Sequence, residues 1–173
     1  REFDADLALD RALEVFWRNG YEGASIADLT AAMGINPPSL YAAFGNKEQL
    51  FRKALDRYVA QHAVFWEEAM KAPTARGTIE HLLRATVRFL TEENNPPGCL
   101  MVRSASQCRE AAEAIQRDLT ARMAEGETML RTRLEEARVA DGGLRDRVLR
   151  LVREAAGTLG FEPRVLLDGP LDT

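Results

Sequence analysis

The sequence predicts an all-α protein, and three observations lead to this fold class. Apolar residues recur at spacings of three and four along most of the chain, which is the period of an amphipathic helix. Stretches that alternate apolar and polar residues, as half-buried strands do, are scarce. Residues that start and stop helices separate the periodic segments. We therefore expect a three-helix head followed by a larger helical domain.

The first two helices of the head are bounded by clear signals. The first is expected over roughly 4–18, where an Asn-Gly pair follows it. Ser25, with Asp28 three residues later, forms a capping-box pattern that opens a second helix over about 26–33. Gly34 closes this second helix.

The third helix of the head starts at a cap followed by proline. Asn36 is the expected N-cap, and Pro37 occupies the first helical position, where its missing N–H costs nothing. This helix should end at Phe44, before a Gly-Asn pair. A long helix is expected over 47–71, so the head ends near residue 46.

The rest of the chain is expected to form one helical domain over 47–160 and an irregular tail over 161–173. Three further helices are predicted over about 78–93, 99–108 and 111–138, and a last amphipathic stretch over 144–159. The tail is rich in Pro, Gly and Asp.

Composition limits the function classes. The chain has 173 residues, of which 46% are hydrophobic, and a net charge of −4. This balance is typical of a folded protein without the broad positive charge that drives nonspecific binding to nucleic acid or lipid. The chain contains two cysteines and no apolar stretch long enough to span a bilayer. A reducing, cytoplasmic location fits best, and no membrane partner is expected.

Two short helices joined by Gly34-Ile35-Asn36 form a candidate helix-turn-helix, whose second helix can enter the major groove of DNA. The segment from Gly20 to Ile26 precedes it, and the order Leu-Tyr-x-x-Phe-x-x-Lys-x-x-Leu begins at Leu40. Together these features, over about residues 3–58, resemble the N-terminal signature of the TetR family of bacterial transcriptional regulators. The resemblance implies a homodimeric, repressor-like protein that leaves a pseudo-palindromic double-stranded DNA operator when a small effector binds.

The resemblance also implies which residues meet DNA. Tyr41 matches the position that directs a ring and hydroxyl at the DNA backbone, and Lys47 matches the position that holds a phosphate at a helix N-terminus. Small residues at the groove-facing positions leave little direct hydrogen-bond readout of the bases. The expected DNA-binding set is Ser25, Ala27, Pro37, Pro38, Ser39, Tyr41, Ala42, Ala43 and Lys47. Taken singly, Ser25 is a cap with or without DNA, and Lys47 would more often be a solvated surface charge.

The charge of the head conflicts with this function. Residues 1–60 contain 7 basic and 9 acidic side chains, a balance of −2, whereas DNA affinity depends on neutralising phosphates. The chain opens on Arg1 rather than Met, so we expect a basic arm ahead of it that compensates.

The resemblance implies an effector cavity in the helical domain, and an apolar ligand is expected there. Each candidate side chain, taken alone, is more often simply part of a helical core. The candidates are Trp66, Met70, Phe89, Cys99, Met101, Cys108 and Met123, with Met129 beside them.

No enzyme, cofactor or metal site is expected. The chain shows no nucleophile with a base and an orienting group, and His62 and His81 lack metal-ligand spacing. Oxidant sensing by Cys99 or Cys108 is a minor alternative, because a buried thiol is ordinarily inert. The main alternative is a helical protein-interaction or small-molecule-binding module that has lost DNA binding. Dimerisation through the final helices is expected from the family, although the tail departs from its pattern.

Overall fold

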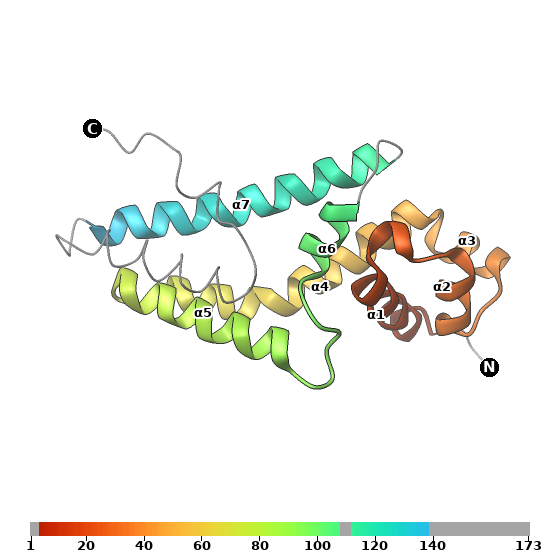
Figure 1. The fold of residues 1–173 in the computed structure, drawn as a ribbon, viewed down its shortest axis with the longest axis horizontal. Helices are drawn as coiled ribbons and strands as arrows, with labels where there is room; N and C mark the ends of the chain where they lie inside the picture. Colours follow the sequence, from red (N-terminus) through yellow and green to blue (C-terminus); the bar gives the residue numbers. More distant parts are fainter. Residues whose placement is uncertain (1–3, 108–111, 139–173) are drawn as a thin grey trace. The chain divides into compact units, whose positions relative to one another are not determined.

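The structure is a computed structural model that describes residues 4–107 and 112–138. In this part of the chain every regular element is a helix, as the sequence predicted (Figure 1). The helices are α1 (Ala5–Gly23), α2 (Ile26–Met33), α3 (Pro37–Phe44), α4 (Lys47–Met70), α5 (Ala75–Thr91), α6 (Leu100–Gln107) and α7 (Glu113–Arg138). None of these helices is both long and apolar enough to cross a membrane.

The predicted bounds agree with the structure where local signals are strong. The second helix runs over Ile26–Met33 and the third over Pro37–Phe44, as expected. α1 extends beyond the predicted stop to Gly23, but Gly20 interrupts its helical geometry with φ 72° and ψ 176°. α5 begins three residues earlier than predicted, at Ala75. The stretch expected over 144–159 and the tail lie outside the described residues.

The chain divides into two compact units. The first comprises residues 1–64 and 87–122, and the second comprises residues 65–86 and 123–173. Three long helices, α4, α5 and α7, therefore contribute to both units. The predicted division into a head over 1–46, a helical domain over 47–160 and a tail stays a prediction.

The core of the first unit joins the head to α4, α6 and α7. Phe16 and Phe51 pack edge to face, with ring centroids 5.0 Å apart, and both are fully buried. Leu100 of α6 and Ile115 and Leu119 of α7 belong to the same apolar cluster. Burying these side chains provides the main driving force for holding the short head helices in place, since isolated helices of eight residues are marginal in water.

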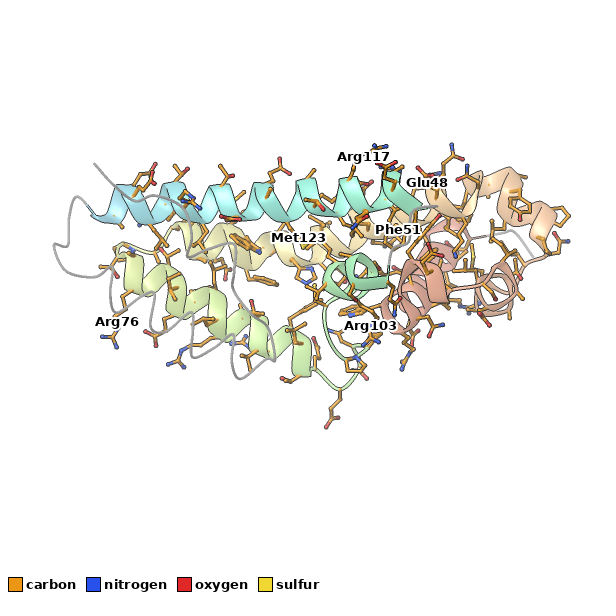
Figure 2. The ribbon with its side chains drawn as sticks, turned by 45° about the horizontal axis from the view of Figure 1, so that its top comes forward. Glu48, Phe51, Arg76, Arg103, Arg117 and Met123 are labelled. Carbon is orange, nitrogen blue, oxygen red and sulfur yellow. The ribbon has the colours of Figure 1, made fainter. Side chains whose placement is uncertain are left out.

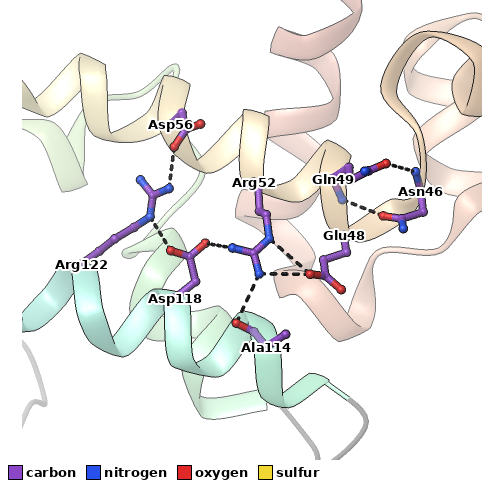
Figure 3. Close-up of polar contacts among 8 residues, drawn as sticks. All are labelled: Asn46, Glu48, Gln49, Arg52, Asp56, Ala114, Asp118 and Arg122. Atoms are coloured by element: carbon purple, nitrogen blue, oxygen red, sulfur yellow. Dashed lines mark hydrogen bonds and ion pairs between the residues drawn. The ribbon is translucent and has the colours of Figure 1, made fainter.

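A network of charged side chains also connects α4 with the first part of α7 (Figure 3). Arg52 donates to Asp118 over 2.7 Å and to Glu48 over 3.0 Å. Arg122 donates to the other oxygen of Asp118 and to Asp56, over 3.0 and 2.6 Å. Asp118 therefore bridges two arginines, one on each helix.

In the second unit, α4, α5 and α7 each contribute buried side chains. Ile79 and Leu82 of α5 are buried, together with Ala69 of α4 and Ala137 of α7. Arg133 of α7 donates to the backbone carbonyls of Met70 and Ala72, which accept at the C-terminal end of α4. Those carbonyls have no partner within the helix, so Arg133 satisfies them.

Candidate nucleic-acid interface

The helix-turn-helix is built by local hydrogen bonds on the sequence signals that predicted it. Ser25 accepts from the Asp28 backbone N–H over 3.0 Å, and Asp28 accepts from the Ser25 backbone N–H over 3.1 Å, which is a complete capping box. Gly34 ends α2 in the left-handed conformation, with φ 70° and ψ 32°. Asn36 then caps α3 by accepting from the Ser39 backbone N–H over 2.9 Å.

One face of α3 is anchored in the core and the other is exposed. Leu40 and Phe44 are buried, while the Tyr41 side chain is 50% exposed. The remaining predicted contact residues on this helix are also exposed, namely Pro37, Pro38, Ser39, Ala42 and Ala43. The helix thus presents a short, mostly small-residue surface with one aromatic ring, which is suited to close approach to a groove.

Of the two predicted contact positions before α3, Ser25 has a defined internal role. Both Ser25 and Ala27 are exposed. The Ser25 hydroxyl donates to Asp28 Oδ2 over 2.6 Å, so its proton is already used inside the capping box. These hydrogen bonds lower the pKa of Asp28 and keep its carboxylate charged. The hydroxyl would have to give up this bond to donate to a phosphate.

Lys47 opens α4 directly after α3. Asn46 caps this helix, because its side chain accepts from the Gln49 N–H over 2.8 Å and Gln49 Oε1 accepts from the Asn46 N–H over 3.1 Å (Figure 3). The Lys47 ammonium lies 4.6 Å from the centre of the Tyr21 ring. Partial burial lowers the pKa of Lys47, and the nearby Glu22 carboxylate opposes this shift. Sequence reasoning missed this Tyr21 contact, although the Gly-Tyr pair was part of the recognised signature.

Many charged side chains of the head are already held in ion pairs. Ion pairs engage five of the eight acidic residues described between positions 4 and 60, namely Asp6, Asp10, Glu14, Glu48 and Asp56. Asp28 is held by its cap, as described above. Among the basic residues described there, Arg11, Lys47 and Lys53 form no ion pair with a carboxylate of the described part of the chain. Each pair neutralises a positive charge together with the carboxylate, so ion pairing leaves the net charge of the head negative.

The residues predicted for an effector cavity divide between the two units. Phe89, Cys99 and Met101 belong to the first unit and pack against its apolar core. Phe89 stacks on Trp17 with centroids 5.1 Å apart, and Cys99 accepts a hydrogen bond from the Tyr58 hydroxyl over 3.5 Å. The contacts of these three residues therefore agree with the alternative that they are part of a helical core.

The remaining effector candidates belong to the second unit or fall outside the description. Trp66 and Met70 are half-buried there. Met123, which is labelled on α7 in Figure 2, is 36% exposed. Cys108 lies outside the described residues. Among those described, no group of three or more His, Cys, Asp or Glu is placed to hold a metal ion.

This geometry defines a helix-turn-helix head with an exposed second helix. The model of the family described as bacterial regulatory proteins, tetR family, matches residues 8–54. The structure of a cysteine mutant of the TetR family transcriptional regulator CifR, complexed with 26-bp double-strand operator DNA, is 39% identical. The match covers 98% of this chain and 90% of the CifR chain, and its TM-score is 0.80. A second structure of CifR with operator DNA is also 39% identical, with a TM-score of 0.78, and the match covers 91% of its CifR chain. The chain belongs to the TetR family.

Curated relatives agree with this assignment over part of their length. The chain is 36% identical over 130 residues to the HTH-type transcriptional repressor ComR of Escherichia coli (strain K12), which covers 74% of this chain and 62% of ComR. It is 34% identical over 104 residues to the repressor BdcR of the same strain, covering 52% of BdcR. The matched segment therefore spans less than two thirds of these two curated repressors.

Proposed function

We propose that this chain is a DNA-binding transcriptional regulator that acts as a repressor. The exposed face of α3, with Tyr41 on it and Lys47 directly after it, is the observation that carries the proposal. Leu40 and Phe44 fix this helix on the core, so its exposed side chains are presented by a rigid support. Solved relatives at 39% identity are complexed with operator DNA, which supports the same partner here.

In this proposal the phosphate contacts supply most of the affinity. The Lys47 ammonium and the N-terminus of α4 attract the same phosphate, and Tyr41 reaches the backbone with its hydroxyl. Pro37, Pro38, Ala42 and Ala43 face the groove as small apolar groups and can contact thymine methyls. With few donors or acceptors on this face, sequence preference relies on DNA shape.

Selection of binding sites from random double-stranded DNA is the experiment that tests the proposal. We expect a two-fold-symmetric site, because a homodimer places two recognition helices about one helical turn apart. Recovery of no DNA, from protein shown to be folded and dimeric, would favour the alternative of a protein-interaction module.

Variants then test the placement of the interface. Tyr41→Ala and Lys47→Ala should each weaken binding across sequences, and Lys47→Ala should flatten the salt dependence by about one unit. Lys71→Ala is the charge-matched control, because Lys71 is exposed at the far end of α4. Unchanged binding in both interface variants would contradict this placement of α3.

We further propose that a small apolar effector releases the DNA. The half-buried Trp66 and Met70 support such a site in the second unit. A Cβ at Gly126 would lie 3.8 Å from the Trp66 ring, an ordinary van der Waals distance, so α7 runs close to the indole here. A fitting ligand should shift the tryptophan fluorescence and lower DNA affinity, and the fluorescence shift should be lost in Trp66→Phe, which keeps Trp17. A ligand that binds beside Trp66 without changing the DNA affinity would contradict the proposal that an effector releases the DNA.

A further inference from the structure

The side chain that carries the proposed phosphate contact is itself supported by an aromatic ring. The Lys47 ammonium lies over the face of Tyr21, 4.6 Å from the ring centre. A cation in this position is attracted by the negative face of the ring. A lysine side chain has a flexible four-carbon stem, so a fixed ring beneath the ammonium restricts where this group can lie.

The Tyr21 ring is in turn fixed from behind. It packs edge to face against Phe51, with centroids 5.0 Å apart, and Phe51 is completely buried. Tyr21 is only partly buried, so the ring has one side on the core and another available to Lys47. Its position is therefore set by the core of the first unit.

The backbone before Tyr21 is also specialised. Gly20 has φ 72° and ψ 176°, a region that only glycine adopts readily. A Cβ at this position would collide with the Gln107 side chain of α6. The turn at Gly20 thus redirects the chain after the regular part of α1 and delivers Tyr21 to the start of α4.

We propose that Tyr21 is a positioning residue for DNA binding, which holds the Lys47 ammonium ready for a backbone phosphate. This inference rests on the proposed function, since it needs Lys47 to contact DNA. A cation held on a ring keeps its N–H donors available to a phosphate, whereas an ion pair with Glu22 would occupy them. Tyr21 thereby reduces the ordering cost that Lys47 would otherwise meet on binding.

A double-mutant cycle tests the inference with a mixed-sequence 26-bp duplex as the probe. Tyr21→Met keeps an apolar side chain against Phe51 but removes the ring, and Tyr21→Phe keeps the ring. We expect Tyr21→Met to weaken binding by about 2- to 10-fold, the cost of ordering one long side chain. Tyr21→Phe should stay within about 2-fold, because Phe also binds a cation on its face.

The Lys47→Ala background separates positioning from a general structural role. There Tyr21→Met should change the affinity by less than about 1.5-fold, since the side chain that it positions is gone. An equal loss in both backgrounds, or no loss in either, overturns the inference while leaving the DNA-binding function standing. Absence of duplex binding by the unmodified chain overturns both.

An NMR measurement on the free, unmodified protein tests the contact without DNA and without a variant that could misfold. The ε-methylene protons of Lys47 should show an upfield ring-current shift in the NMR spectrum of the unmodified chain and of Tyr21→Phe. Random-coil shifts for these protons in the unmodified chain would show that the ring does not hold Lys47, and would overturn the inference.

Discussion

Trp17 of α1 donates its indole N–H to the backbone carbonyl of Gly98 over 2.6 Å, across 81 residues of sequence. The same ring lies edge to face with Tyr58, with centroids 4.8 Å apart. The segment before α6 is held at a second point, where Arg103 donates to the Pro97 carbonyl over 3.0 Å. A side chain of the head thus fixes the segment that leads into α6.

Replacing this tryptophan should show what the hydrogen bond contributes. Trp17 is 3% exposed whereas Gly98 is exposed, so Trp17→Phe removes the donor from a carbonyl that water can reach. We expect the free energy of unfolding to fall by about 0.5–1.5 kcal/mol, the net value of one hydrogen bond, measured by urea denaturation. Trp66→Phe leaves this hydrogen bond intact and serves as the control. If both variants lost the same free energy of unfolding, the smaller ring and not the hydrogen bond would explain the effect.

The turn at Gly20 should tolerate no side chain. Gly20→Ala places a Cβ in a backbone region that is nearly exclusive to glycine, whereas the flexible end of the Gln107 side chain can move aside. The expected loss of unfolding free energy is about 1–3 kcal/mol. Gly23→Ala is the matched control, because a Cβ there meets only Asn19 Cβ, at 3.5 Å. Similar thermal stability of the two variants would contradict this account of the turn.

The bridge between α4 and α7 should depend on Asp118. Its side chain is 18% exposed and accepts from both Arg52 and Arg122, so Asp118→Asn removes two charge-assisted contacts (Figure 3). We expect a loss of about 1 kcal/mol that shrinks at high salt, since both arginines are partly exposed. Glu113→Gln, which breaks the exposed Glu113–Arg117 pair, should have little effect. A loss for Asp118→Asn that is independent of salt would rule out an ionic origin.

Acid should weaken the aromatic cluster around His62. Burial lowers the pKa of His62 below its ordinary value of 6.5, although the Tyr58 carbonyl bound to Nδ1 opposes the shift. The unfolded chain therefore binds the proton more readily than the folded one. The stabilising contribution is present above pH 6.5 and is lost as the pH falls from 6.5 toward the folded pKa.

The pH dependence of unfolding checks this expectation. Urea denaturation between about pH 7.5 and 5.5 should show the decline for the unmodified chain and a flatter profile for His62→Leu. His81→Leu, at the half-exposed histidine beside Glu68, should keep the part of the slope that His62 contributes. An unchanged profile in His62→Leu would contradict the assignment.

The helices of the head could be predicted because their signals are local. Ser25 and Asp28 lie three residues apart, and so do Asn36 and Ser39, so each cap forms within one turn whatever the rest of the chain does. The family signature then indicated which side chains face DNA, and that set remains a proposal. The exposure of Tyr41 agrees with it, since Leu40 takes the core position on the same helix.

The contacts that hold these helices in position were decided by the tertiary structure. Arg52 and Asp118 are 66 residues apart, and Trp17 and Gly98 are 81 apart, so no local pattern pairs them. Phe89 and Cys99 were expected in the effector set because the family resemblance implies a cavity lined by such side chains, but cores and pockets share a composition, and the structure packs both residues against the core. The sequence by itself determined which segments are helical, because caps and periodicity act within a few residues. The tertiary structure decided which side chains meet, because the burial that brings α1, α4, α6 and α7 together acts across the whole first unit.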